Sequence, residues 1–254
     1  MSNSTEKPAN GDNKIRGVFS SQKVMKVGTG TTTRKTVQQT FHYAEELPNG
    51  DIELQLLNAN HMPAGSKETV TKDELLQKYS PEPELYQTTV YPKMKEVGKT
   101  LARADRHRKR GETFSAEMCY NDALKVDDQN VRANFGIGMC YLQRGESAKA
   151  DDILKRIVKL DAAFEEEHKH MFNEFGINLR KNKMAEQAVE YYKRAAEFTK
   201  NDENLQYNIA RAYFDQGRFA DAKTYCEKAL TINPDLDEAK KMIELMLSKK
   251  LLDN

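Results

Sequence analysis

Four stretches of the chain repeat one pattern: RGETFSAEMCYNDAL at 110–124, RGESAKADDILKRIV at 144–158, NKMAEQAVEYYKRAA at 182–196 and QGRFADAKTYCEKAL at 216–230. Each stretch has an alanine at the same place, and these are Ala116, Ala150, Ala188 and Ala222. The intervals between successive alanines are 34, 38 and 34 residues. Self-similarity at this period is typical of a helical repeat array. Such an array presents a surface for another polypeptide and rarely contains a catalytic centre.

The composition agrees with stacked amphipathic helices. Hydrophobic residues make up 38% of the chain and charged residues 31%, which suits helices that each keep one polar face in water. The net charge of +1 predicts no general attraction to nucleic acid or to membranes. No apolar run is long enough to span a bilayer, and the N-terminal residues lack the apolar segment of a signal peptide. We therefore expect a cytoplasmic protein that does not bind membranes.

No group of residues in the sequence indicates catalysis or metal binding. The three cysteines, Cys119, Cys140 and Cys226, are odd in number and form no CxxC pair, so we expect small packing residues in a reducing compartment. His168 and His170 are two residues apart, so on a helix they point in different directions, and further metal ligands are missing. We expect no catalytic residues, no metal and no cofactor.

The segment before the array has a different character. Residues 1–16 are polar and mixed in charge, which predicts a disordered tail. Residues 17–91 predict a small α+β unit, in which strands 40–46 and 51–57 form a hairpin around Asn49-Gly50. Val24, Met25 and Val27 can add a strand before this hairpin, and residues 68–70 can add one after it. Thr71 and Glu74 have the spacing of a capping box, so a short helix should run to Tyr79 and stop before Pro81.

From residue 92 to residue 254 the pattern is helical throughout and resembles the tetratricopeptide repeat, a 34-residue helix–turn–helix unit. The resemblance implies a mainly α solenoid with four units, at 97–130, 131–164, 169–202 and 203–236, and a capping helix at 237–250. Small residues occupy the family's close helix crossing, namely Ala104, Gly138, Gly176 and Ala210. The turn between the two helices holds Gly111, Gly145, Lys183 and Gly217. The 38-residue interval leaves residues 165–168 between two units, either as an early turn of the next helix or as a loop.

The resemblance also implies where a partner binds, because in this family the first helices line a concave groove. The matching positions are Asp105, Arg108, Arg132, Phe135, Met139, Leu142, His170, Asn173, Ile177, Arg180, Lys181, Tyr207, Asn208, Arg211, Phe214 and Asp215. Asn208 holds a position where the family often grips a peptide backbone. Arg132, Arg180 and Arg211 add positive charge to an apolar lining, so we expect a partner segment with apolar anchors and an acidic group. The alternative for any one of these side chains is packing against the neighbouring repeat.

These features favour a non-catalytic scaffold or adaptor that binds another protein. A bacterial secretion or assembly chaperone is a more specific alternative. A nucleic-acid-associated protein that uses the basic N-terminal half is the alternative from another class, although sparse aromatic residues argue against single-strand binding. Self-association is a further alternative, because the array begins with a basic helix and the stretch 202–238 is acidic.

Overall fold

The computed structural model describes residues 14–27, 34–199 and 201–252. The chain divides into two compact units, Met1–Glu96 and Val97–Asn254. The tail expected at residues 1–16 lies for the most part outside the described residues.

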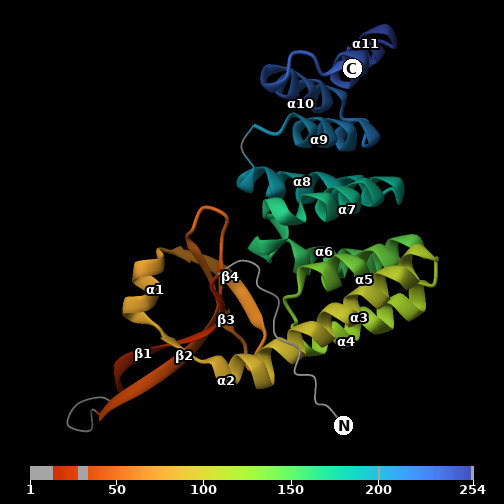
Figure 1. Ribbon diagram of the computed structural model, residues 1–254. Coiled ribbons are helices and arrows are strands. Elements are labelled where there is room, and N and C mark those ends of the chain that lie inside the picture. Colours follow the sequence, from red (N-terminus) through yellow and green to blue (C-terminus); the bar gives the residue numbers. More distant parts are fainter. Residues whose placement is uncertain (1–13, 28–33, 200, 253–254) are drawn as a thin grey trace, which may run out of the picture. The chain divides into compact units, whose positions relative to one another are not determined.

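An antiparallel sheet with the strand order β4-β3-β2-β1-β5 forms the centre of the first unit (Figure 1). Its strands are β1 (Arg16–Val27), β2 (Arg34–Glu46), β3 (Ile52–Leu57), β4 (Pro63–Val70) and β5 (Ser80–Pro81). The hairpin predicted at Asn49-Gly50 is confirmed as the β2–β3 connection, and Gly50 has a φ of +89° that favours glycine. β2 begins six residues earlier than the predicted strand, because it pairs with β1 along its whole length.

Both faces of the sheet are covered. On one face Phe19, Ala44 and Leu54 pack with Leu75 of helix α1 (Lys72–Lys78). On the other face the Tyr43 ring lies 6.3 Å from the ring of Tyr86, which begins the π-helical turn η2 (Tyr86–Val90). This cover buries the centre of the sheet, whereas Val37 of β2 and Leu56 of β3 stay 57% and 51% exposed.

The capping box at the start of α1 is partly confirmed, because the Thr71 side chain accepts a hydrogen bond of 3.2 Å from the Glu74 backbone N–H. The structure beyond α1 was not predicted from the sequence. Ser80 and Pro81 pair with β1, and Pro83 then opens the short helix α2 (Pro83–Leu85). Helical structure continues through η2 into α3, so it begins well before the expected start at residue 92.

The second unit consists of paired helices that succeed one another in layers, ending in blue at α11 (Figure 1). Their bounds are α3 (Tyr91–Lys109), α4 (Thr113–Val126), α5 (Val131–Gln143), α6 (Ser147–Ile157), α7 (Lys169–Lys181), α8 (Ala185–Phe198), α9 (Glu203–Asp215), α10 (Phe219–Ile232) and α11 (Asp237–Ser248). The predicted mainly α solenoid is confirmed. Within the described part of the chain, no helix combines the length and apolar character that crossing a bilayer requires.

The four alanines that define the repeat frame are all completely buried. They lie near the start of the second helices α4, α6, α8 and α10, where a small side chain lets two helices approach. The close crossings are tight: a Cβ on Gly138 would lie 2.6 Å from the Phe175 ring, and one on Gly176 would lie 2.4 Å from the Tyr192 ring. The repeat frame therefore reflects a packing requirement.

The turns between paired helices use a left-handed residue in each unit. Gly111, Gly145 and Gly217 have φ values of 76°, 71° and 74°. Lys183, at the same place in the third unit, has a φ of 62°. A β-carbon costs energy in this conformation, so Lys183 is held there by the turn that surrounds it.

Of the four extra residues 165–168, the last three form a short 3₁₀ helix, η4 (Glu166–His168), which leads directly into α7. The chain therefore does make a helical turn before α7, although it is a 3₁₀ turn, and a further 3₁₀ helix, η3 (Asp161–Phe164), comes before these residues. Phe164, which directly precedes these four residues, is buried, and its ring stacks on that of Phe198 of α8 at a centroid distance of 5.5 Å, so the connection is held against α8 at this point. α7 then begins at Lys169.

Candidate functional site

The first helices of the four units differ in how much of their surface is open. Phe135, Met139 and Leu142 of α5 are 2%, 4% and 2% exposed, so these three predicted groove residues pack inside the array. The ring of Phe135 contacts Phe175 of α7 at a centroid distance of 5.6 Å. The first helix of the second repeat, α5, therefore offers little apolar surface to a partner.

Several predicted groove residues form ion pairs between helices. Arg132 of α5 donates a hydrogen bond of 2.9 Å from Nε to Asp105 of α3, and Asp105 also accepts one of 2.5 Å from Tyr120. Arg108 of α3 donates a hydrogen bond of 3.0 Å to Glu174 of α7. These bonds join the first three units, so the charges of Arg132 and Arg108 are already compensated.

Arg180 of α7 is neutralised in the same way, by a hydrogen bond of 2.8 Å from its Nε to Asp215 of α9. Arg211 of α9 differs, because its guanidinium lies over the Tyr207 ring at 5.8 Å and forms no ion pair with a described residue. Burial raises the pKa of Tyr207, and the charges of Arg211 and Arg180 act in the opposite direction. Both guanidinium groups therefore lie near this ring.

α7 and α9 keep the most open part of the predicted site. On α7, His170 and Lys181 are exposed and Ile177 is half-buried, opposite the buried Phe172, Phe175 and Leu179. On α9, Asn208 and Arg211 are half-buried. We call His170, Ile177, Lys181, Asn208 and Arg211 the α7–α9 face.

Two of the remaining predicted residues, Tyr207 and Phe214, pack against other side chains of the array. Tyr207 packs against the cluster of Ala210, Cys226 and Ala239, which closes the C-terminal end of the array. The Phe214 ring meets Phe219 edge-on at 5.3 Å. Asn173 is half-buried on α7.

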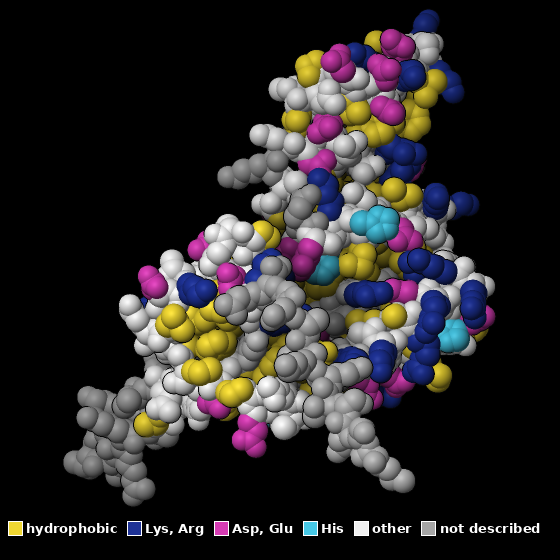
Figure 2. Space-filling model, in the orientation of Figure 1, with side chains coloured by type: hydrophobic (Ala, Val, Ile, Leu, Met, Phe, Trp, Pro, Cys, Tyr) yellow, Lys and Arg dark blue, Asp and Glu magenta, His cyan; other side chains and the backbone are white. Residues whose placement is uncertain are grey.

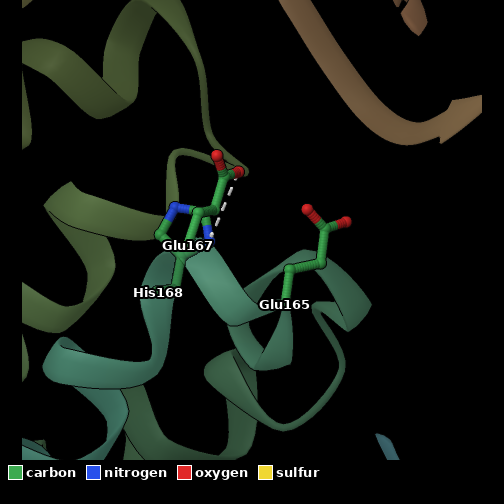
Figure 3. Close-up of side chains that lie close together, drawn as sticks. All are labelled: Glu165, Glu167 and His168. Atoms are coloured by element: carbon green, nitrogen blue, oxygen red, sulfur yellow. Dashed lines mark ion pairs between the residues drawn. The ribbon is translucent and has the colours of Figure 1, made fainter. Parts of the chain in front are cut away.

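One group in the described residues has the chemistry of a metal site. Glu165, Glu167 and His168 bring their ligand atoms within 4.8 Å of one another (Figure 3). His168 Nδ1 lies 3.7 Å from a Glu167 carboxylate oxygen. His170, the second of the two neighbouring histidines, is not part of this group. Acidic side chains often gather at a surface without an ion, so the group alone does not define a metal centre.

The sequence pattern did not single out an exposed apolar pair on α4. Phe114 is 73% exposed and Met118 is 62% exposed, and with Glu117 and Asn121 they line a surface depression. The spacing of four residues between Phe114 and Met118, on the side of α4 away from Ala116 and Tyr120, is the signal that identifies them.

Family models with the description tetratricopeptide repeat match the array at residues 101–165 and 204–236. Neither match extends into Met1–Glu96. A TPR repeat-containing protein of Methanocaldococcus jannaschii is 26% identical over 148 residues, which are 56% of this chain and 26% of that protein. The chain thus spans about a quarter of the length of that curated relative.

Solved structures of similar proteins include the MamA protein, at 24% identity over 62% of this chain and 84% of that chain, with a TM-score of 0.47. They also include pilF of Pseudomonas aeruginosa, at 19% identity over 61% of this chain and 69% of that chain, with a TM-score of 0.46. A third is MamA from Desulfovibrio magneticus, from residue 41 to its end, at 16% identity over 61% and 85% of the two chains, with a TM-score of 0.47.

Proposed function

Because the chain is a tetratricopeptide-repeat protein, we propose that it is a non-catalytic scaffold whose α7–α9 face holds a segment of a partner protein. The partner segment carries at least one apolar side chain and one carboxylate. Arrays of this class bind through extended surfaces of their repeats, which supports the assignment of a protein as the partner.

The observation that carries the proposal is the difference between Arg180 and Arg211. Arg180 is neutralised by Asp215, whereas Arg211 is half-buried over an aromatic ring without a carboxylate among the described residues. A partly desolvated guanidinium gains most from a bidentate carboxylate. A partner's acidic side chain or carboxyl terminus would therefore be bound most strongly at Arg211.

Ile177 and Asn208 supply the other contacts that a bound peptide needs. Ile177 is a half-buried apolar side chain on the outward side of α7, where an apolar anchor of the partner would complete its burial. Asn208 is half-buried and its amide can both donate to and accept from a peptide backbone. The resemblance to the family supports this role for Asn208.

Site-specific photo-crosslinking in cells that make the protein tests the proposal. A benzoylphenylalanine at Ile177 should crosslink a partner, which mass spectrometry identifies, and Arg211→Glu in the same chain should abolish the product. The control is the same crosslinker at Glu190, an exposed position on the second helix α8. Equal crosslinking from both positions, or none from Ile177, would contradict the proposal.

A further inference from the structure

One face of α3 carries a row of cations with no acidic partner among the described residues. The row consists of Lys99, Arg103 and Arg106 of α3 and of Arg110, which directly follows the helix and whose backbone N–H still bonds to the Arg106 carbonyl. All four are exposed, and we call them the basic stripe. Their steps of four, three and four residues place them within about 60° around the helix and over about 17 Å along it. The stripe lies opposite Val97, Leu101 and Ala104, the residues that α3 buries.

The other arginines of the compact unit Val97–Asn254 all have side-chain contacts. Those in ion pairs are Arg108, Arg132, Arg144, Arg180, Arg194 and Arg218. Arg156 donates to Asn134, and Arg211 lies over the Tyr207 ring. Within the described part of the unit, only the three arginines of the basic stripe have no ion pair, side-chain hydrogen bond or ring contact. Figure 2 shows Lys and Arg side chains gathered at the lower right, over the region that α3 and α4 occupy in Figure 1.

The surroundings of the basic stripe favour an acidic protein segment over a nucleic acid as its ligand. No Phe, Tyr or Trp lies between Val97 and Arg110, so the stripe lacks the large aromatic rings on which bases usually stack. His107, beside the stripe on the same helix, binds the Glu112 carboxylate, which places negative charge next to the row. The net charge of +1 supplies no wider positive field for a duplex.

We propose that the basic stripe of α3 docks an acidic segment of a partner protein. Successive cations are about 4.5 to 6 Å apart along the helix axis. Carboxylates three and four residues apart on a partner helix have the same spacing, so the two rows can pair one to one. This surface lies on a different helix from the α7–α9 face and does not depend on it.

Binding of a labelled 20-residue peptide by the full chain, measured by fluorescence anisotropy, tests this proposal. The peptide carries glutamate at alternating three- and four-residue steps on an alanine-rich helix, and a matched peptide carries glutamine in place of glutamate. The third probe is a 20-base-pair DNA duplex. We expect the glutamate peptide to bind more tightly than the other two probes.

Two charge-matched variants identify the surface. Arg103→Glu, Arg106→Glu and Arg110→Glu together should weaken binding of the glutamate peptide at least tenfold. Lys241→Glu, Lys249→Glu and Lys250→Glu change the net charge equally at exposed positions of the C-terminal end, and should change binding less than twofold. The proposal is overturned if no peptide binds, if both variants lose binding equally, or if the duplex binds more tightly than the glutamate peptide. Circular dichroism confirms that each variant is folded.

Discussion

The guanidinium of Arg180 on α7 donates a 2.8 Å hydrogen bond to the carboxylate of Asp215 on α9. The Arg180 side chain is only 10% exposed, so water competes weakly for this bond. The pair ties the first helix of the third unit to the first helix of the fourth. The pair also neutralises the positive charge of Arg180, which was expected from the sequence to bind a partner. Arg211 is then the guanidinium that remains available on the α7–α9 face.

Arg180→Met should lower the free energy of unfolding by about 1.5 kcal/mol, the low end for a charged hydrogen bond, because Asp215 is partly exposed and regains water. Urea unfolding followed by circular dichroism measures the change. Asp215→Asn and the double variant complete a cycle, in which the double variant should be less destabilised than the sum of the single variants. Simple additivity would show that the pair contributes nothing.

Gly176→Ala should destabilise the array by about 1 to 3 kcal/mol, because its Cβ would lie 2.4 Å from the buried Tyr192 ring. The matched control is Gly98→Ala on α3, where nothing lies within 4 Å of the new Cβ. This control should raise stability by about 0.5 to 1 kcal/mol, since alanine favours helix over glycine. Thermal unfolding of both variants checks the two signs, and a loss of stability in both would refute the packing argument.

Lys183→Gly should stabilise the array by about 1 kcal/mol, because Lys183 has a φ of 62° and glycine adopts that conformation without strain. The reverse change at the equivalent turn, Gly217→Lys, should cost about as much. Chemical unfolding of the two variants measures both effects. A neutral result for Lys183→Gly would mean that the greater chain entropy of glycine when unfolded cancels the strain.

Two buried tyrosines should respond in opposite ways to loss of the hydroxyl. Tyr191 Oη is buried and has no hydrogen-bond partner among the described residues, so Tyr191→Phe should raise stability by about 1 kcal/mol. Tyr120 Oη donates a bond of 2.5 Å to Asp105, so Tyr120→Phe should lower stability by about 1.5 kcal/mol. Urea unfolding of the pair tests this, and destabilisation by Tyr191→Phe would point to an ordered water at its hydroxyl.

The repeat frame could be predicted from the sequence because each of its positions has one packing requirement. Ala116 and Gly176 are buried where two helices cross, and only small residues fit there. Lys183 was placed at a turn by its position alone, and its positive φ agrees. The Asn49-Gly50 turn was predictable for the same local reason.

The openness of the site could not be predicted in this way. A repeat position tells which side of its own helix a residue occupies, but not how closely the next repeat approaches. Gly136 and Gly138 are both buried and let Tyr120 and Phe175 come close to α5, so Phe135, beside them, is covered too. Ion pairs raise the same difficulty, since Arg108 pairs with Glu174, which is 66 residues away in the chain.

Quantitative affinity capture of the full chain tests the central claim most directly. Ile177→Glu with Arg211→Glu should reduce recovery of the partner that crosslinks at Ile177 by at least tenfold. The control, Leu247→Glu with Lys249→Glu, changes the net charge equally at exposed positions of the C-terminal end and should leave recovery unchanged. Equal recovery with the two variants, when both are folded, would contradict binding at the α7–α9 face.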